Sequence, residues 1–142
     1  MIAVDSNILV YAHRVDSEFH GPAVEAVKGL AEGKRSWALL WPCVHEFLAI
    51  ATHPRIYDPP SPAGRATAQV EAWLDSPTVV LLSEGLDHWR ELATMVMAGA
   101  IGPRVHDARI AALCHTTGVT ELWSADRDFS RFNLNVTNPL IR

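Results

Sequence analysis

The chain has 142 residues, of which 49% are hydrophobic and 20% are charged. This length suits one domain around one core, and the apolar fraction excludes intrinsically disordered and low-complexity fibrous proteins. Twelve Lys and Arg residues against sixteen Asp and Glu residues give a net charge of −4. A nucleic-acid partner would therefore require a local basic patch or bound metal ions. We predict a single domain over residues 1–142.

Several features of the sequence bear on its cellular compartment. No apolar run approaches the roughly 18 residues that a membrane-spanning helix needs. An acid stands at position 5 and no basic segment precedes it, so no secretory signal is visible. Cys43 and Cys114 are too few for a disulfide scaffold, and each is expected to be a small buried hydrophobe. We expect a cytoplasmic protein that makes no membrane contact.

Apolar spacing alternates between strand and helix periodicity along the chain. The expected strands are residues 2–4, 36–41, 78–82, 120–124 and 135–137. The expected helices are residues 8–12, 23–31, 42–51, 64–74, 86–96 and 107–115. Pro42 suits the first turn of a helix, and Gly118 suits the end of one. This alternation of apolar strands with helices predicts an α/β fold in which helices cover both faces of a parallel sheet.

One segment interrupts the alternation. Four prolines fall within residues 54–62, and proline is incompatible with a regular helix interior. We predict a rigid surface loop from Pro54 to Pro62 that connects two parts of the same domain.

Several common catalytic motifs do not occur in the sequence. Neither G-x-x-x-x-G-K-[ST] nor G-x-G-x-x-G is present, so no nucleotide-binding loop is indicated, and no G-x-S-x-G serine-hydrolase motif occurs. The pair His45-Glu46 does not continue as a zinc-protease motif, because Ala49 stands where the second histidine would be. The cysteines lack partners at zinc-site spacing. Among the seven histidines, His106 attracts attention because it precedes an acid.

Four acidic residues fall at one edge of the predicted sheet. Asp5 and Asp126 each follow a strand, Glu46 lies about one turn into the helix after the second strand, and Asp107 opens a later helix. The carboxyl ends of parallel strands are where such sheets bind ligands. Converging carboxylates repel one another, and a hard divalent cation is their natural counter-charge. Oxygen-only ligands favour Mg²⁺, with Mn²⁺ as a substitute.

Each acid also has an ordinary structural explanation. Asp5 suits a helix N-cap, Glu46 an exposed helix position, and Asp107 the positive end of a helix. Asp126 and Asp128 are typical turn residues. Ser6, Asn7 and Ser124 are common capping residues. The joint placement of the four acids at one edge favours a shared site.

These residues together resemble the PIN-domain ribonucleases, in particular the VapC toxins of bacterial toxin–antitoxin pairs. The motifs are Asp5-Ser6-Asn7, the isolated Glu46, residues 107–112 and Ser124-Ala125-Asp126-Arg127-Asp128-Phe129. The resemblance covers essentially the whole chain. It implies a three-layer α/β/α sandwich with a central parallel sheet of four to five strands, Mg²⁺-dependent endonucleolytic cleavage of RNA, a homodimer, and neutralisation by a cognate VapB-type antitoxin. The proline-rich loop is not a general feature of that family.

The resemblance also assigns roles to residues. The acidic quartet of the family, catalytic and metal-binding, is matched by Asp5, Glu46, Asp107 and Asp126. Asp128 matches a variable fifth acid that also contributes to the metal site. The polar supports are matched by Ser6, Asn7 and Ser124. The reaction expected of such a site is hydrolysis of a phosphodiester by a metal-activated water, with Asp5 and Asp107 as principal metal ligands.

Substrate binding is expected to depend on local basic groups. The candidate RNA contacts near the acidic edge are Arg14, Arg104, Arg109, Arg127 and Arg131. Each can alternatively be a solvated surface charge. Two other functions remain open: a PIN-like module that binds RNA or a partner without cleavage, and a metal-dependent phosphatase acting on a small phosphate ester.

Apolar side chains outside the predicted site suggest core and partner contacts. We expect the five tryptophans to lie mostly in the core, and any exposed one to serve a dimer or antitoxin interface. Residues 22–30 and 64–74 are candidate walls of an antitoxin groove, or simply core-facing helices.

Overall fold

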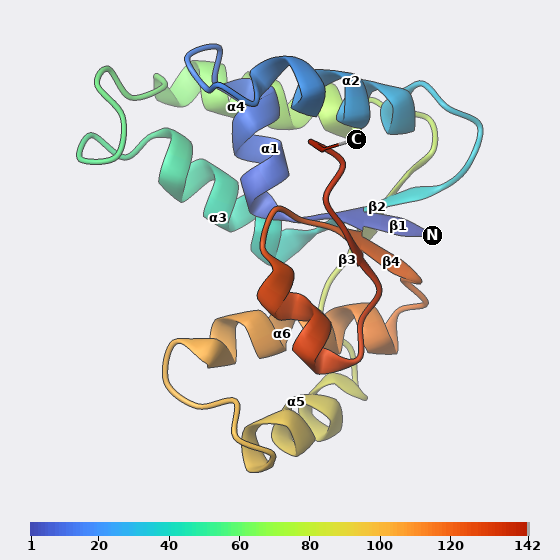
Figure 1. The fold of residues 1–142 in the computed structure, drawn as a ribbon. Helices are drawn as coiled ribbons and strands as arrows, with labels where there is room; N and C mark the ends of the chain where they lie inside the picture. Colours follow the sequence, from blue (N-terminus) through green and yellow to red (C-terminus); the bar gives the residue numbers. More distant parts are fainter. Residues whose placement is uncertain (142) are drawn as a thin grey trace.

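The computed structural model describes residues 1–141 and contains a five-stranded, all-parallel sheet in the order β3-β2-β1-β4-β5 (Figure 1). Arg142, the last residue of the predicted domain, lies outside the described residues. The strands are β1 (Ile2–Val4), β2 (Trp37–Leu40), β3 (Val79–Leu82), β4 (Glu121–Trp123) and β5 (Val136–Thr137). Each lies within or matches a predicted strand, because short apolar runs between helices favour the centre of a covered parallel sheet.

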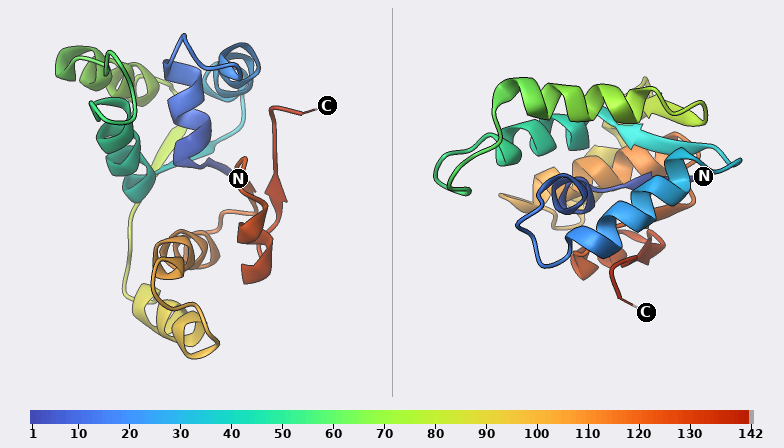
Figure 2. Two further views of the ribbon diagram at one scale, coloured as in Figure 1. Left: turned by 60° about the vertical axis from the view of Figure 1, so that its left-hand side comes forward. Right: turned by 90° about the horizontal axis from the view of Figure 1, so that it is seen from above.

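Helices cover both faces of this sheet. The helices are α1 (Ser6–His13), α2 (His20–Ala31), α3 (Trp41–Ala51), α4 (Ala63–Leu74), α5 (His88–Met97), α6 (Arg104–Thr116) and the 3₁₀ helix η1 (Arg127–Phe132). Helices α1 to α4 lie on one side and α5, α6 and η1 on the other (Figures 1 and 2). The predicted three-layer α/β/α sandwich is therefore confirmed.

The core lies where the central strands meet these helices. All four residues of β2 are buried, as are Ala3, Val4 and Leu122 of the neighbouring strands. Cys43 and Cys114 are free and buried, as expected for small apolar residues. Pro42 occupies the first turn of α3, and Gly118 takes a positive φ of 78° just after α6. Both match the predicted helix boundaries.

Helix α5 departs from the prediction. No residue of α5 is buried, and the helix packs mainly against α6 at the end of the molecule far from the sheet (Figure 2). Trp89 is 72% exposed, so it is an exception among tryptophans that were expected to lie mostly in the core. Leu86 was predicted inside the helix but precedes it and is fully exposed. An amphipathic pattern gives a helix its apolar face and does not specify how much of that face is covered.

The proline-rich segment is a loop, as predicted, and it is attached to the end of α1. The Ser61 backbone N–H donates to the Ala51 carbonyl at 2.8 Å. The buried Ser61 hydroxyl lies 2.8 Å from Nε2 of His13 and accepts a hydrogen bond from Nη1 of Arg14 at 3.2 Å. The Arg14 guanidinium also stacks over the Tyr57 ring at 4.1 Å. Side chains at the end of α1 therefore hold the loop.

None of the helices within residues 1–141 has both the length and the apolar character required to cross a bilayer.

Candidate active site

A cavity of about 130 Å³ opens beside the carboxyl ends of β1 and β4. Its lining comes from α1, α3, α6 and the segment after β4. The lining residues are Asp5, Ser6, Asn7, Glu46, Ile50, His106, Asp107, Ile110, Asp126 and Phe129. The structure thus brings together the four acids that the sequence singled out, although they lie up to 121 positions apart in the chain.

Asp5 is the buried centre of the site. It follows β1 directly and caps α1, because its extended backbone lets Oδ1 accept a hydrogen bond from the Ser6 N–H at 2.8 Å. Its Oδ2 accepts a hydrogen bond from the Ser124 hydroxyl at 2.7 Å. Burial raises the pKa of Asp5 to about 6, and the nearby Glu46 carboxylate adds to this, although the two hydrogen bonds oppose it. Asp5 is only 6% exposed, so its charge is poorly hydrated.

Ser6 connects Asp5 to α3. Its hydroxyl donates to Oε1 of Glu46 at 2.7 Å and lies 3.5 Å from Oδ1 of Asp5. Ser6 therefore holds Glu46, whose side chain is otherwise exposed on α3, beside the buried carboxylate.

Cys43 is a contact that sequence reasoning missed. Its thiol lies 3.7 Å from Oδ1 of Asp5 as a weak hydrogen-bond donor. Burial, followed by the Asp5 charge, raises the pKa of this thiol well above its ordinary value, so it stays protonated. The spacing of Cys43 could have predicted this contact. Cys43 stands one turn before Glu46 on α3, and side chains three residues apart share a helix face.

Asn7 and Ser124 join the start of α1 to the segment after β4. The Asn7 amide donates to the Ser124 hydroxyl oxygen at 3.2 Å and accepts from the Ala125 N–H at 3.2 Å. The Ser124 hydroxyl oxygen also accepts the Asp126 N–H at 3.0 Å. The polar residues that the sequence suggested as supports thus hold both Asp5 and the backbone that carries Asp126.

Asp107 and Asp126 complete the acidic lining from the other side of the cavity. Asp107 lies in the first turn of α6 and is half-buried. Burial raises its pKa, and repulsion from Asp126, Glu46 and Asp128 adds to the effect. Asp126 caps η1 by accepting the Asp128 N–H at 2.9 Å. Glu46 is thus close enough to act on both Asp107 and Asp5, and it links the two sides of the cavity electrostatically.

The fifth acid lies apart from this lining. The Asp128 side chain is 65% exposed and lies 3.7 Å from the Arg131 guanidinium. The Asp128 charge contributes to the raised pKa of Asp107. Asp128 is not among the residues that line the acidic cavity.

The predicted arginines do not form one patch beside the acids. Arg14 lies past the far end of α1, paired with Asp16 at 2.6 Å, and it lines a different cavity beside the proline loop. Its expected position at the acidic edge is wrong, because the eight residues of α1 separate it from Asp5. Arg109 forms an ion pair with Glu84. Arg127 is exposed on η1, while Arg104 and Arg131 line a third cavity.

The donor set fits a hard divalent cation. Carboxylate, hydroxyl and amide oxygens face the cavity, and these are the ligands that Mg²⁺ prefers. Within residues 1–141, no three His, Cys, Asp or Glu side chains are close enough together to form a ready metal site. Mg²⁺ keeps several water ligands, and these can bridge the distance to carboxylates that do not bind the ion directly. The chemistry of the residues therefore fits the ion, although their spacing is wider than that of a closed site.

A three-layer sandwich with carboxylates gathered at the strand ends is the architecture of the PIN domain, and the PIN-domain family model matches residues 2–134. Ribonuclease VapC37 of Mycobacterium tuberculosis is 33% identical over 135 residues, covering 93% of this chain and 92% of that protein. Ribonuclease VapC43 of the same species is 35% identical, covering 93% and 90%. The chain belongs to the VapC ribonucleases of the PIN-domain family.

Solved structures show the same fold. The crystal structure of Mycobacterium tuberculosis VapC20, described as a Sarcin-Ricin loop cleaving toxin, matches with a TM-score of 0.70 and 16% identity, covering 94% of this chain and 96% of that one. VapBC2 from Rickettsia felis, bound to a DNA fragment from its promoter, matches with a TM-score of 0.67 and 18% identity, covering 97% and 98%.

Proposed function

We propose that this protein is a cytoplasmic, Mg²⁺-dependent endoribonuclease and the toxic component of a VapBC-type toxin–antitoxin pair. The observation that supports this most strongly is the cavity at the strand ends, which is lined by four carboxylates from four separate segments. The curated relatives are called ribonucleases, and VapC20 is described as a Sarcin-Ricin loop cleaving toxin. Mn²⁺ would substitute for Mg²⁺, because both accept oxygen ligands.

The proposed roles follow from the contacts of each residue. Asp5, Glu46, Asp107 and Asp126 would hold the ion, with Asp128 at the rim. Bound there, Mg²⁺ supplies a water of lowered pKa and charge compensation for the phosphate.

The surrounding residues orient these ligands. Ser124 and Ser6 fix the two oxygens of Asp5, Ser6 also fixes Glu46, and Asn7 holds the segment that carries Asp126. This support matters because metal affinity and activity depend on hydrogen bonds to the ligands as well as on the ligands themselves.

A groove between α2 and α4 supports the antitoxin proposal. Its cavity of about 250 Å³ is lined by Ala12, Val24, Val27, Lys28, Ala31, Gln69 and Trp73. The two segments suggested as groove walls thus line one cavity. The similar fold of VapBC2 from Rickettsia felis supports an antitoxin partner for this chain. We propose that the groove receives an apolar side of the antitoxin.

A homodimer is part of the same proposal. Trp89 projects from α5 at 72% exposure, and exposed aromatic side chains are common anchors of protein interfaces.

Cleavage assays on single-stranded RNA test the proposal. Purified protein should cleave in Mg²⁺ and lose activity in EDTA. Asp107→Asn should reduce cleavage by more than about 100-fold, because even changes to residues that support metal ligands cost 10- to 100-fold. Asp75→Asn, an exposed acid at the end of α4, is the matched control and should cleave normally.

Three outcomes would contradict the proposed Mg²⁺-dependent endoribonuclease. Strong cleavage by Asp107→Asn or in EDTA would show that the reaction does not depend on a metal ion at this site. Binding of RNA without cleavage would favour the non-cleaving module. Hydrolysis of p-nitrophenyl phosphate without RNA cleavage would favour the phosphatase.

A further inference from the structure

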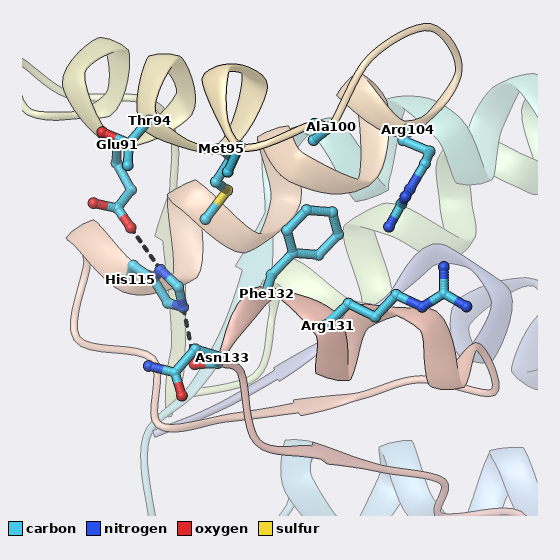
Figure 3. Close-up of a pocket in the computed structure, with 11 residues that line it drawn as sticks. Glu91, Thr94, Met95, Ala100, Arg104, His115, Arg131, Phe132 and Asn133 are labelled. Carbon is cyan, nitrogen blue, oxygen red and sulfur yellow. Dashed lines mark hydrogen bonds and ion pairs between the residues drawn. The ribbon is translucent and has the colours of Figure 1, made fainter.

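A cavity much larger than the acidic one lies between α5, α6 and η1 (Figure 3). Its volume is about 550 Å³, against about 130 Å³ for the acidic cavity. Arg104 of α6, Arg131 and Phe132 of η1, and Glu91 of α5 are among its lining residues. The acidic site uses none of these side chains, so the cavity requires its own explanation.

Two guanidinium groups lie on one side of this cavity (Figure 3). Arg104 is exposed and has no ion-pair partner within residues 1–141. The partner of Arg131 is Asp128, at 3.7 Å, and a pair so exposed contributes little. Both arginines are therefore available to an anionic ligand. Two planar guanidinium groups suit the oxygens of a phosphate.

The opposite end of the cavity is closed by a bridge that joins three elements. His115 of α6 lies 2.8 Å from Oε1 of Glu91 through Nδ1 and 3.2 Å from the Asn133 carbonyl oxygen through Nε2 (Figure 3). His115 thus links α5 to the residue that follows η1. The Glu91 carboxylate pairs with His115 and not with the two arginines. The cavity consequently has a basic side and an internally paired side.

Phe132 adds an apolar surface next to the basic groups. Its half-buried ring lies in the cavity lining beside the arginines (Figure 3). Unpaired RNA bases bind proteins by stacking on aromatic rings, while arginines contact their phosphates. A single-stranded nucleotide presents both groups at once, so its chemistry matches that of the cavity.

The two cavities are built on the same two elements. On α6, Arg104 lines the large cavity and Asp107, three residues later, lines the acidic one. On η1, Phe129 lines the acidic cavity and Phe132 lines the large one. Side chains three apart on a helix are neighbours, with Cβ atoms about 5–6 Å apart. One RNA strand could therefore occupy both cavities with adjacent nucleotides.

We propose that this second cavity is a nucleotide subsite of the RNA substrate, next to the bond that is cleaved. Arg104 and Arg131 bind a phosphate of the strand, and Phe132 stacks on its base. The inference rests on the proposed endoribonuclease function. An acidic segment of a protein partner fits less well, because carboxylates would pair with the arginines but leave the Phe132 ring without a stacking partner.

Binding measurements on an inactive protein test the subsite. The background is Asp107→Asn, the probe is short fluorescein-labelled single-stranded RNA of random sequence, and fluorescence anisotropy in Mg²⁺ gives the Kd at several salt concentrations. Arg104→Ala and Arg131→Ala should each weaken binding and reduce the slope of log K against log salt by about 0.7 for each lost phosphate contact. Arg90→Ala, an exposed arginine of α5 outside the cavity, is the matched control and should leave both unchanged.

The aromatic ring is tested separately from the charges. Phe132→Leu should weaken binding by about 5- to 100-fold without changing the salt slope, because stacking releases no counterions. Phe132→Tyr keeps the ring and should bind like the parent protein, which separates loss of stacking from loss of folding.

The outcomes distinguish this inference from the proposed function. If Kd and salt slope stay within about twofold in all the cavity variants while the wild-type protein still cleaves RNA, the subsite is wrong and the endoribonuclease stands. If the variants weaken only the complex with the antitoxin, the cavity belongs to the protein partner and the subsite is also wrong. If the wild-type protein cleaves no RNA, the proposed function fails whatever the binding data show.

Discussion

Among the carboxylates of the acidic site, Asp5 is the one whose ionisation lowers the stability of the folded protein most. It is 6% exposed, and burial together with Glu46 raises its pKa from 3.8 to about 6. The folded protein therefore binds this proton more tightly than the unfolded chain does. The resulting stabilisation is complete below about pH 4 and is lost as the pH rises through about 6.

This difference predicts a pH-dependent effect of Asp5→Asn in metal-free protein. The variant does not titrate at this position, so its free energy of unfolding relative to wild type should rise by up to about 3 kcal/mol between about pH 4 and pH 7. Urea denaturation in EDTA across this range measures the effect, with the exposed Asp75→Asn as control. A difference that is constant with pH would show that Asp5 is not destabilised by its surroundings.

Bound Mg²⁺ should instead favour the wild-type protein over Asp5→Asn in thermal stability. A ligand that binds only the folded state stabilises it, so Mg²⁺ should raise the Tm of wild type and leave that of Asp5→Asn nearly unchanged. Equal increases in both proteins would contradict the assignment of Asp5 as a ligand.

Ser124 is the residue whose loss should disturb the site most without removing a carboxylate. Its hydroxyl donates to Asp5 and accepts from Asn7 and Asp126. Ser124→Ala should lower the free energy of unfolding by about 1–3 kcal/mol, because it leaves buried polar groups without partners. RNA cleavage should fall about 10- to 100-fold through weaker metal binding.

The matched control for this change is Ser83→Ala, at an exposed position. Urea denaturation and cleavage rates at several Mg²⁺ concentrations check both effects. A Ser124→Ala protein with the wild-type Mg²⁺ dependence would contradict the supporting role.

Among the larger elements, the proline-rich loop shows how a segment without regular structure is fixed in place. The buried Ser61 hydroxyl connects the loop to His13 and Arg14 at the end of α1. Ser61→Ala should lower the free energy of unfolding by about 1–3 kcal/mol, because the His13 ring nitrogen then lacks this hydrogen-bond partner. Urea denaturation against Ser36→Ala, an exposed serine, measures the cost. An unchanged midpoint would mean that the prolines alone order the loop.

The elements themselves were largely predictable from the sequence. Apolar runs bounded by capping residues placed the strands, and Pro42 and Gly118 gave two helix boundaries. The position of α5 was not predictable, because its periodicity defines an apolar face and leaves the partner of that face undefined. Trp89 is consequently exposed although its spacing is that of a core residue.

On the scale of the whole molecule, parallel topology explains why the acids could be found from the sequence. Strand ends of one sheet meet at one edge, so Asp5 and Asp126 were expected to be neighbours even though β1 and β4 are far apart in sequence. The arginines had no such constraint. Long flexible side chains pair with whichever acid is near, as Arg14 does with Asp16, and no periodicity specifies that choice.

The negative net charge of the whole molecule predicts that RNA binding depends on divalent cations. The molecule carries −4, and the cavity proposed to receive the phosphodiester is lined by four acids. Repulsion between these carboxylates and a phosphate should make wild-type RNA affinity at least about tenfold weaker in EDTA than in Mg²⁺ at equal ionic strength. Replacing two of the acids, as Asp107→Asn with Asp126→Asn, should remove most of this dependence and strengthen binding in EDTA.

Fluorescence anisotropy with short single-stranded RNA measures this dependence, and exposed Asp75→Asn with Asp87→Asn is the control of equal charge. If the control pair strengthens binding in EDTA as much as the site pair does, total charge rather than the acidic cavity sets the affinity. If only the site pair does so, the repulsion is local, and a cation in the cavity serves RNA binding as well as the reaction. Equal affinity of the wild type in EDTA and Mg²⁺ would contradict both explanations, because the phosphate would then bind away from the carboxylates.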